Sequence, residues 1–403
     1  MLTSVRVPVV SEAEHSAPDD ARPTLMCFSH LRWDFVFQRP QQLMSRFADD
    51  MTIIYWEEPM ETGAGETPKL QVRSAEDFPN IRIVVPHLPE GLDEDQRDMM
   101  LKRLLDAYAA GLSRPLVAWY YTPMMLTFSR DLDASVTVFD AMDELSKFKF
   151  APARLLELEQ ELIDRADLVF TGGSSLFEAK RDRHDSVYLF PSSVDRKHFA
   201  KARSALPQPE DQAAIAQPRL GFYGVLDERF DTELLGQVAE MRPDWSFVMV
   251  GPVVKISDDD LPKRPNIHYL GSKKYEQLPA YLSGWDVALM PFAMNESTQF
   301  ISPTKTPEYL AGGKPVVSTP VKDVVRHYGQ LQGVGIAATA DEFVEQCEHM
   351  LRLDADGDWL SEADLLLSAS SWATTQARMA ALIGALIGER STSSSPALLV
   401  AAE

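Results

Sequence analysis

The sequence predicts an α/β protein made of two doubly wound, Rossmann-like domains that face a cleft. Short runs rich in Val, Ile and aromatic residues recur along the chain and alternate with amphipathic stretches, which is the pattern of a parallel sheet covered by helices. A stretch rich in Ala, Gln and Pro at residues 201–218 interrupts this series, which then starts again. Because ligands collect at the carboxyl ends of parallel strands, we expect the functional site between the two halves.

Composition supports a globular protein. The 403 residues are 45% hydrophobic and 25% charged, which leaves room for two cores and excludes a fibrous or disordered chain. The net charge of −21 disfavours broad binding to nucleic acid or to an anionic membrane. We therefore expect no nucleic-acid partner and at most a peripheral membrane contact.

The chain also carries features of an intracellular protein. No apolar run is long enough to cross a bilayer, and the first twenty residues are acidic where a signal peptide is apolar. Cys27 and Cys347 are too few for a disulfide framework and are predicted to be buried thiols. The predicted location is the cytoplasm, with any peripheral contact at the inner face of the cell membrane.

The first domain is expected over residues 23–200, after a disordered tail at 1–22. Its predicted strands are residues 25–30, 51–56, 81–86, 115–121, 136–141 and 167–172. An amphipathic helix is predicted over 153–166, and a helix-like stretch at 95–111 is interpreted as core packing. These elements describe one βα-alternating unit.

The second domain is expected over residues 201–370. Its predicted strands are residues 219–224, 245–251, 267–271, 286–291 and 315–320. Its predicted helices are residues 231–240, 274–283, 304–312 and 340–352. A helix with one apolar face over 371–388 and a tail at 389–403 complete the chain.

The segment 286–321 carries the clearest chemistry. After a polar loop, a helix begins whose first turn carries Lys305 and, three residues later on the same face, Glu308. A helix N-terminus with an added lysine favours phosphate, and a carboxylate accepts two hydroxyl hydrogen bonds from a ribose. The residues expected to bind such a ligand, with its phosphate and its ribose, are Ser302, Pro303, Thr304, Lys305 and Glu308. The alternative is an ordinary solvated Lys/Glu pair.

These residues belong to the motif P-x-K-x-x-E-Y-L-A-x-G-K-P-V-V, from Pro303 to Val317. It resembles the nucleotide-sugar signature of GT-B glycosyltransferases, in particular the family-four-like bacterial enzymes of cell-surface polysaccharide synthesis. Further segments carry the resemblance: FSHLRWDFVFQRPQQLMSRFA (28–48), VFDAMDELSKF (138–148), RADLVFTGGSSLFEAK (165–180), FYGVLDERFD (222–231) and SWATTQARMAALI (371–383). The first of these resembles teichuronic-acid-type glycosyltransferases, and the K-x-x-E core resembles the K-x-x-Q of xanthan-type glucuronosyltransferases.

The resemblance implies roles for individual residues. Lys305 is expected at the diphosphate and Glu308 at the ribose, with Gly224 allowing close approach to the phosphates and Arg229 neutralising them. The residues implied at the nucleobase are Tyr275, Leu278 and Pro279. The helix over 371–388 is implied to cross back to the first domain.

One position departs from that family. Its members place two glutamates eight residues apart, but Phe300 occupies the position eight before Glu308. The missing glutamate handles the donor sugar in the family, and Asn295 and Glu296 are the candidate substitutes here. The sequence therefore leaves the donor sugar and the stereochemistry of transfer open.

Candidate catalytic residues follow the strand at 136–141. Asp140 is predicted to contact substrate, and Asp143 is the candidate general base of an inverting transfer. Lys147, four residues on, is expected to lower the pKa of Asp143. The alternative is that Asp140, Asp143 and Glu144 cap the start of a helix.

The first βα loop offers further candidates. His30 is proposed as catalytic, and Trp33, Gln38 and Arg39 are expected to face a sugar, Trp33 by stacking on a pyranose ring. Gly172 resembles the small turn that lines the cleft in the family. The alternatives are that Trp33 is a packing residue and that Gly172 serves a tight turn.

The sequence predicts a glycosyltransferase that moves a sugar from a UDP- or GDP-sugar to a carbohydrate or lipid-linked acceptor. The expected ligands are the nucleotide-sugar donor and the acceptor; no permanently bound cofactor and no metal are expected. Two alternatives remain: a non-catalytic nucleotide-sugar-binding partner, and an epimerase or hydrolase on the same fold. A nicotinamide dehydrogenase is disfavoured because no G-x-G-x-x-G follows a strand.

Overall fold

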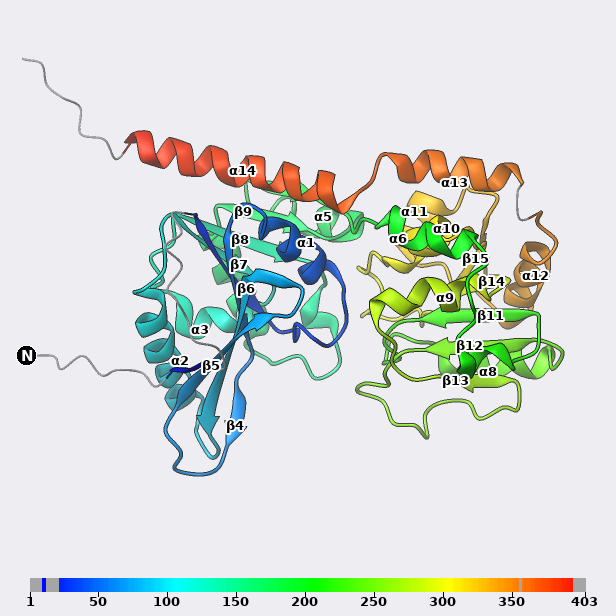
Figure 1. Ribbon diagram of the computed structural model, residues 1–403, viewed down its shortest axis with the longest axis horizontal. Helices are drawn as coiled ribbons and strands as arrows, with labels where there is room; N and C mark the ends of the chain where they lie inside the picture. Colours follow the sequence, from blue (N-terminus) through cyan, green and yellow to red (C-terminus); the bar gives the residue numbers. More distant parts are fainter. Residues whose placement is uncertain (1–8, 12–21, 355–356, 394–403) are drawn as a thin grey trace, which may run out of the picture.

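The computed structural model describes residues 9–11, 22–354 and 357–393 of the chain. Two parallel-rich sheets, each covered by helices on both faces, lie side by side, and Figure 1 shows them as the two halves of the molecule. The predicted α/β class with two doubly wound units is confirmed.

The first sheet has, within the described residues, the order β1-β5-β6-β3-β2-β7-β8-β9-β10, with β4 paired to β6. Its strands are β1 (Val9–Ser11), β2 (Thr24–Ser29), β3 (Thr52–Glu57), β4 (Met60–Thr62), β5 (Lys69–Ala75), β6 (Phe78–Pro89), β7 (Leu116–Tyr120), β8 (Val136–Ala141), β9 (Leu168–Thr171) and β10 (Val187–Leu189). β5 and β6 pair antiparallel, whereas the neighbouring pairs β3–β6, β2–β3 and β2–β7 are parallel.

The second sheet has the order β13-β12-β11-β14-β15-β16, and its neighbouring strands pair in parallel. Its strands are β11 (Arg219–Tyr223), β12 (Ser246–Val250), β13 (Ile267–Tyr269), β14 (Val287–Met290), β15 (Val316–Ser318) and β16 (Val334–Ile336). The order reverses between β11 and β14, which is where a doubly wound sheet binds its ligand.

Helices connect and cover the strands. In the first half they are α1 (Arg39–Phe47), α2 (Glu94–Ala109), α3 (Leu126–Ser129), α4 (Leu155–Arg165) and α5 (Ser174–Lys180). Between the sheets and in the second half they are α6 (Arg196–Phe199), α7 (Glu210–Ala213), α8 (Thr232–Met241), α9 (Leu278–Ser283), α10 (Lys305–Ala311), α11 (Lys322–Tyr328), α12 (Ala340–Met350) and α13 (Asp358–Ser368). The last helix, α14 (Trp372–Ser393), returns to the first half. Short 3₁₀ helices are η1 (Pro123–Met125), η2 (Leu145–Lys147), η3 (Ala200–Arg203) and η4 (Tyr275–Gln277).

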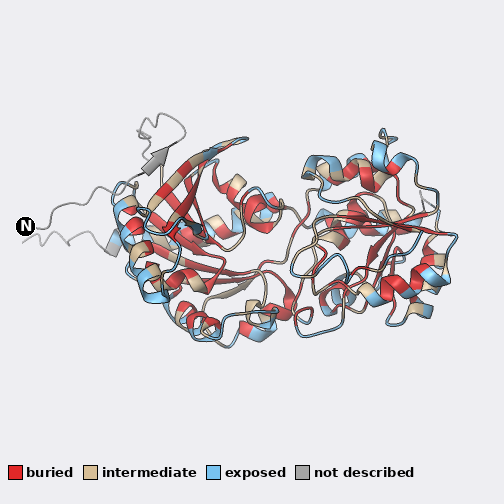
Figure 2. Cartoon of the chain, turned by 90° about the horizontal axis from the view of Figure 1, so that it is seen from below, coloured by how far each residue is buried: buried red, intermediate tan, exposed pale blue. Residues whose placement is uncertain are grey.

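The strands carry the hydrophobic cores. Figure 2 shows buried residues concentrated in both sheets and exposed residues on the outer helices. Two clusters line the two faces of the first sheet, and a third fills the second half. Cys27 and Cys347 are buried in these cores as free thiols, as predicted.

The last helix packs on the first half although it follows the second in sequence. α14 contacts α1 and β8, and its residues Trp372, Met379 and Ile383 are buried in the first half's core (Figure 1). α14 runs to Ser393, five residues beyond the predicted end at 388, so this part of the expected tail is helical. Arg390 hydrogen-bonds Ser135 and Asp167, which ties the added turn to the first half.

Several strands of the structure were not predicted from the sequence. β1 lies within the expected tail at 1–22 and pairs with β5, and the remainder of that tail, except Arg22, lies outside the described residues. β4, β5, β10 and β16 were not predicted either. β4, β10 and β16 have three residues each, and β5 alternates apolar with polar residues, so none of the four carries the apolar run that marks a buried strand.

The two halves meet through a polar contact between α5 and α11. The buried Asp323 carboxylate accepts hydrogen bonds from the Ser175 N–H at 3.1 Å and from the Ser175 hydroxyl at 2.6 Å. Ser174 Oγ lies 2.8 Å from His327 Nε2, and Glu178 pairs with Lys322 and Arg326. A carboxylate of one half therefore caps a helix of the other.

In the part of the chain that is described, we find no helix with both the length and the apolar character needed to span a bilayer.

We predict that Ile383→Ala lowers the free energy of unfolding by about 2–4 kcal/mol, because it opens a cavity between α14 and the first half's core. Urea denaturation followed by tryptophan fluorescence measures the change. Ala381→Gln on the exposed side of the same helix is the control and is expected to stay within about 0.5 kcal/mol. Equal stability of Ile383→Ala and the control would contradict the packing of α14.

Candidate functional site

The predicted site residues gather where carboxyl ends of strands from both halves meet. His30 follows β2 and Asp143 follows β8 in the first half. Gly224 follows β11, and Lys305 begins α10 after β14, in the second. Charge interactions link Asp143 to Arg229 and Lys305, so the two halves share one site.

Lys305 lies across the turn that follows β11. A Cβ atom at Gly224 would stand 2.2 Å from Lys305 Cε, and Gly224 has φ +144°, so both space and backbone conformation require glycine there. A Cβ at Gly251 would in turn strike the Gly224 carbonyl oxygen at 1.8 Å. The turns after β11 and β12 thus touch backbone to backbone and leave the Lys305 ammonium group at the cleft.

Lys305 and Glu308 are half-buried and lie close together, as predicted. Burial raises the pKa of the Glu308 carboxyl group to about 7, and the nearby Lys305 opposes this rise. Burial also lowers the pKa of Lys305. Among the described residues, Lys305 has no ion pair within 4 Å. The pair therefore differs from a solvated helix pair and offers a cation and a carboxylate to a ligand.

Arg229 is held in the turn by a carboxylate that the sequence analysis missed. Asp227 is buried and accepts from Arg229 Nε at 3.0 Å and from Nη2 at 2.6 Å. This fork fixes the guanidinium plane and leaves the side chain about one-quarter exposed. The sequence signal that could have revealed this ion pair is the acidic residue two positions before Arg229.

Asp143 faces the cations of the second half, but Lys147 does not accompany it. Burial raises the pKa of Asp143 to about 6, with Arg229 and Lys305 opposing and Asp227 adding to the rise. Lys147 Nζ instead pairs with Glu296 at 3.1 Å across the cleft. The expected lowering of the Asp143 pKa by Lys147 is wrong, because the chain forms a short 3₁₀ helix from Leu145 and never the α-helical turn that would align the two.

The helix-cap alternative for Asp143 is also unsupported, because Glu144 occupies the N-cap position of η2. Glu144 is anchored by the buried Lys180, whose Nζ lies 2.9 Å from Glu144 Oε2 and 3.0 Å from Glu159. This buried network holds the loop that presents Asp143.

Phe148, a second residue missed by sequence analysis, joins the loop to the other half. Its ring lies 5.3 Å from the Arg229 guanidinium and 5.0 Å from Lys255 Nζ. Both distances fit cation–π contacts. Its position in the sequence, next to Lys147 and Lys149 and two residues before Phe150, carried no signal for this role.

His30 reaches the same region from the first βα loop. Burial, assisted by the charge of Lys255, lowers the pKa of His30 to about 4, so the imidazole is neutral at pH 7. Its Nδ1 atom is buried and has no hydrogen-bond partner among the described residues. A neutral ring suits hydrogen bonding to a ligand better than proton transfer at pH 7.

Trp33 does not face the cleft as expected. It is 8% exposed and packs edge-on against Tyr55 and Phe78 in the core, so it has no free face for a pyranose. Gln38 is half-buried and occupies the N-cap position of α1, where its backbone N–H donates to Gln41 Oε1. The expected sugar contact of Gln38 stays a prediction.

Arg39 and Asp140 form a buried ion pair instead of contacting substrate. Arg39 Nη2 lies 2.7 Å from Asp140 Oδ1, and Nη1 donates to the Phe190 carbonyl at 2.8 Å. Both side chains are almost fully buried. The prediction that they contact substrate is wrong because the two residues stand 101 positions apart in the sequence, and only the folded sheet brings them together.

Gly172 likewise serves packing. A Cβ there would lie 3.0 Å from the Met142 Cα and carbonyl oxygen, so glycine lets the chain after β9 approach the chain after β8. The neighbouring Gly173 is tighter still, with a Cβ only 2.5 Å from both Ser302 and Asp323 of the second half. Ser302, Pro303 and Thr304 are half-buried and lie between this contact and Lys305.

The predicted nucleobase segment lies at the junction of the two halves. Tyr275 stacks on His198 with ring centroids 4.2 Å apart and accepts a hydrogen bond from Gln42 Nε2 at 3.1 Å. Leu278 packs against the core and Pro279 is buried. Of the three, Tyr275 alone presents a half-buried polar group near Glu308, whose charge raises the Tyr275 pKa together with burial.

Asn295 and Glu296 lie on an exposed loop and are engaged with the protein. Asn295 Oδ1 accepts from Ser297, and Nδ2 donates to the Glu228 carbonyl at 3.3 Å. Glu296 pairs with Lys147 and is 78% exposed. Neither offers a free buried carboxylate in place of the one that Phe300 removes.

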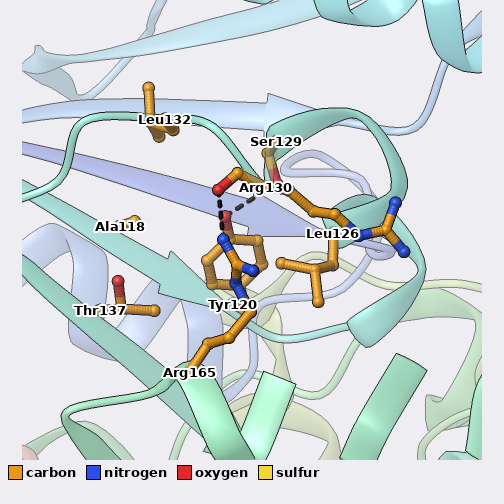
Figure 3. Close-up of a pocket in the computed structure, with 8 residues that line it drawn as sticks. All are labelled: Ala118, Tyr120, Leu126, Ser129, Arg130, Leu132, Thr137 and Arg165. Atoms are coloured by element: carbon orange, nitrogen blue, oxygen red, sulfur yellow. Dashed lines mark hydrogen bonds between the residues drawn. The ribbon is translucent and has the colours of Figure 1, made fainter. Parts of the chain in front are cut away.

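Metal sites and surface hollows add no further candidate among the described residues. Across the described residues, no group of three or more His, Cys, Asp or Glu side chains is placed to hold a metal ion. A hollow of about 250 Å³ lies on the first sheet beside α3 and α4 (Figure 3). Its Arg130 is bound by Glu161, its Tyr120 by Ser129, and none of the predicted site residues lines it.

Known proteins resemble this chain in sequence and in fold. Residues 217–353 match the family described as Glycosyl transferases group 1. Over 187 residues the chain is 30% identical to TuaH of Bacillus subtilis, named as a teichuronic acid biosynthesis glycosyltransferase. That match covers 43% of this chain and 45% of the relative, so the matched part spans less than half of the relative's length.

Solved structures share the fold along almost the whole chain. A sucrose-phosphate synthase from Thermosynechococcus elongatus has a TM-score of 0.62 at 16% identity, covering 91% of this chain and 100% of that one. The Anabaena protein Alr3699/HepE, solved with UDP and glucose, has a TM-score of 0.64 at 12% identity, covering 89% of this chain and 99% of that one. The chain therefore has the GT-B fold, and residues 217–353 in its second half are similar to the glycosyl transferases group 1 family.

We predict that Gly224→Ala weakens the binding of inorganic pyrophosphate about 10-fold or more, because the new methyl group displaces the Lys305 side chain. Isothermal titration calorimetry measures the affinity. Gly271→Ala is the matched control, since Gly271 also has positive φ but a Cβ there meets nothing within 4 Å. Equal loss in both variants would assign the effect to backbone strain and contradict the role of the Lys305 contact.

Proposed function

We propose that this protein is a glycosyltransferase that moves a sugar from a nucleotide diphosphate sugar to a carbohydrate or lipid-linked acceptor. The observation that supports it most is the Lys305–Glu308 pair beside Gly224, inside the matched group 1 domain. A cation for the diphosphate and a carboxylate for the ribose stand one helical turn apart. We assign residues 201–370 to the donor, and residues 23–200 with the helix at 371–388 to the acceptor.

The donor would lie against the second half. Lys305 and Arg229 would hold the diphosphate, Glu308 would accept hydrogen bonds from the ribose hydroxyls, and Tyr275 would border the base. As the glycosidic bond to the diphosphate breaks, negative charge grows on the leaving group. Two cations already fixed near that position stabilise this charge without moving, and no metal is needed for the proposal.

Asp143 would serve the acceptor from the opposite wall. Its pKa of about 6 leaves it mostly ionised at pH 7, and a base with a pKa near the working pH is well matched to removing a hydroxyl proton. This role applies to an inverting transfer. In a retaining transfer, Asp143 would instead orient the acceptor.

The acceptor and the setting are proposed on the relative's name. We infer a step in cell-surface polysaccharide synthesis, since the curated relative is named for teichuronic acid biosynthesis. Such a donor is made inside the cell, so we propose a cytoplasmic protein with at most peripheral contact at the inner membrane face. The donor is the ligand, and no permanently bound cofactor is proposed.

The first test is a thermal-shift panel of UDP, GDP and ADP with their common sugars. We expect one nucleotide series to raise the melting temperature of the natural protein, and Glu308→Ala to lose most of that shift while the exposed-site control Glu345→Ala keeps it. Product analysis with the binding sugar nucleotide then establishes transfer. No shift with any nucleotide, or an undiminished shift in Glu308→Ala, would contradict the proposal.

Nucleotide binding should also depend on pH through Glu308. In the empty site its carboxyl group, with a pKa of about 7, is mostly protonated at pH 6 and mostly ionised at pH 8. Ribose hydroxyls donate to the ionised form, so the nucleotide should bind about 10-fold more tightly at pH 8 than at pH 6. Titration calorimetry on Glu308→Gln, which cannot ionise, should lack this increment. Parallel pH profiles for the two proteins would refute the assignment.

A further inference from the structure

We propose that Glu228 is the carboxylate that recognises the transferred sugar, binding its hydroxyl groups together with His30 from the opposite wall of the cleft. This inference rests on the proposed function, because it assigns the sugar of the donor whose diphosphate Lys305 and Arg229 would hold. No sequence motif singled out Glu228.

Glu228 has one oxygen in use and one without a partner. Its side chain is 13% exposed, and Oε1 lies 3.3 Å from Lys255 Nζ. Oε2 is buried and has no hydrogen-bond partner among the described residues. Leaving a buried carboxylate oxygen unpaired is costly, so such an atom points to a missing hydrogen-bond donor.

Lys255 fixes the direction in which that oxygen faces. Its backbone has φ +63°, a conformation that a residue with a side chain rarely adopts, and its ammonium group lies over the Phe148 ring. The ion pair with Glu228 further restricts the position of the Lys255 side chain. Because Lys255 occupies Oε1, the carboxylate presents Oε2 in a set orientation.

A second unpaired atom belongs to His30. His30 Nδ1 is also buried and has no hydrogen-bond partner among the described residues, and the charge of Lys255 contributes to the lowered pKa of His30. His30 belongs to the first half and Glu228 to the second. Each half therefore supplies one buried polar atom without a partner, and Lys255 acts on both side chains.

The chemistry of these two atoms selects the ligand. A carboxylate oxygen accepts from a hydroxyl, and a neutral imidazole nitrogen accepts from or donates to another. An anionic group would be repelled by Glu228, and an apolar one would leave both atoms unpaired. A neutral pyranose with several hydroxyl groups fits this pair.

The chain position of Glu228 assigns this sugar to the donor. Glu228 stands between Asp227 and Arg229 in the turn after β11, so its backbone belongs to the element that would bind the diphosphate. The sugar of a nucleotide diphosphate is attached to the outer phosphate and must lie close to that element. Asn295 and Glu296, the candidates from sequence, are bound to Ser297 and Lys147.

The test compares a nucleotide sugar with its parent nucleotide. The probes are the UDP- or GDP-sugar that binds the natural protein most tightly in the panel above and the corresponding nucleoside diphosphate. Glu228→Gln should weaken binding of the sugar nucleotide about 10-fold and leave the parent nucleotide within about 2-fold. Glu233→Gln, an exposed carboxylate on α8, is the matched control and should change neither.

Monodeoxy analogues of the same nucleotide sugar locate the contact. Removing the hydroxyl that Glu228 binds should weaken binding to the natural protein but add little to the loss in Glu228→Gln. Unchanged sugar-nucleotide affinity, an equal loss for the parent nucleotide, or an effect confined to the KM of the acceptor would each overturn the inference. If no nucleotide binds the natural protein, the proposed function itself fails, which is a distinct result.

Discussion

The contact between Asp323 and Ser175 is the constraint on which the site depends. Neither half holds a complete set of groups: Asp143 and His30 come from the first, Lys305, Glu308 and Arg229 from the second. Asp323 is buried and satisfied by a serine of the other half, so separating the halves would strand its charge. This interface therefore sets the distance across which donor and acceptor groups face one another.

Within that frame, buried networks hold the charged groups in place before any ligand arrives. Asp227 forms an ion pair with Arg229, and Lys180 forms one with Glu144, the neighbour of Asp143. The Phe148 ring contacts both Arg229 and Lys255. Such prior fixing is what gives electrostatic stabilisation its effect, because nothing must reorganise when charge develops. Glu228 Oε2 and His30 Nδ1 are among the buried polar atoms without a hydrogen-bond partner in the described residues, and we assign both to a ligand.

Sequence analysis grouped Lys305, Glu308 and Gly224, which the structure also places together, because the signals that group them are local. Lys305 and Glu308 share one helical turn, and Gly224 ends a strand, so spacing alone places them at one edge of a sheet. It failed where partners are distant: Arg39 pairs with Asp140 and Lys147 with Glu296. The prediction that Trp33 stacks on a sugar was wrong for a related reason. Whether a tryptophan in a loop is buried or exposed depends on the segments that pack over it.

By itself, the sequence determined the α/β class, most strands of both sheets and the cation-carboxylate pair of the donor site, because hydrophobic periodicity and near-neighbour spacing encode them. Tertiary structure alone decided which charges are consumed as buried ion pairs and which stay free for a ligand. It also decided the roles of Phe148, Lys255 and Glu228, which meet across the two halves. The physical reason is that electrostatic roles depend on burial and on the identity of partners far along the chain, and neither is written in local sequence.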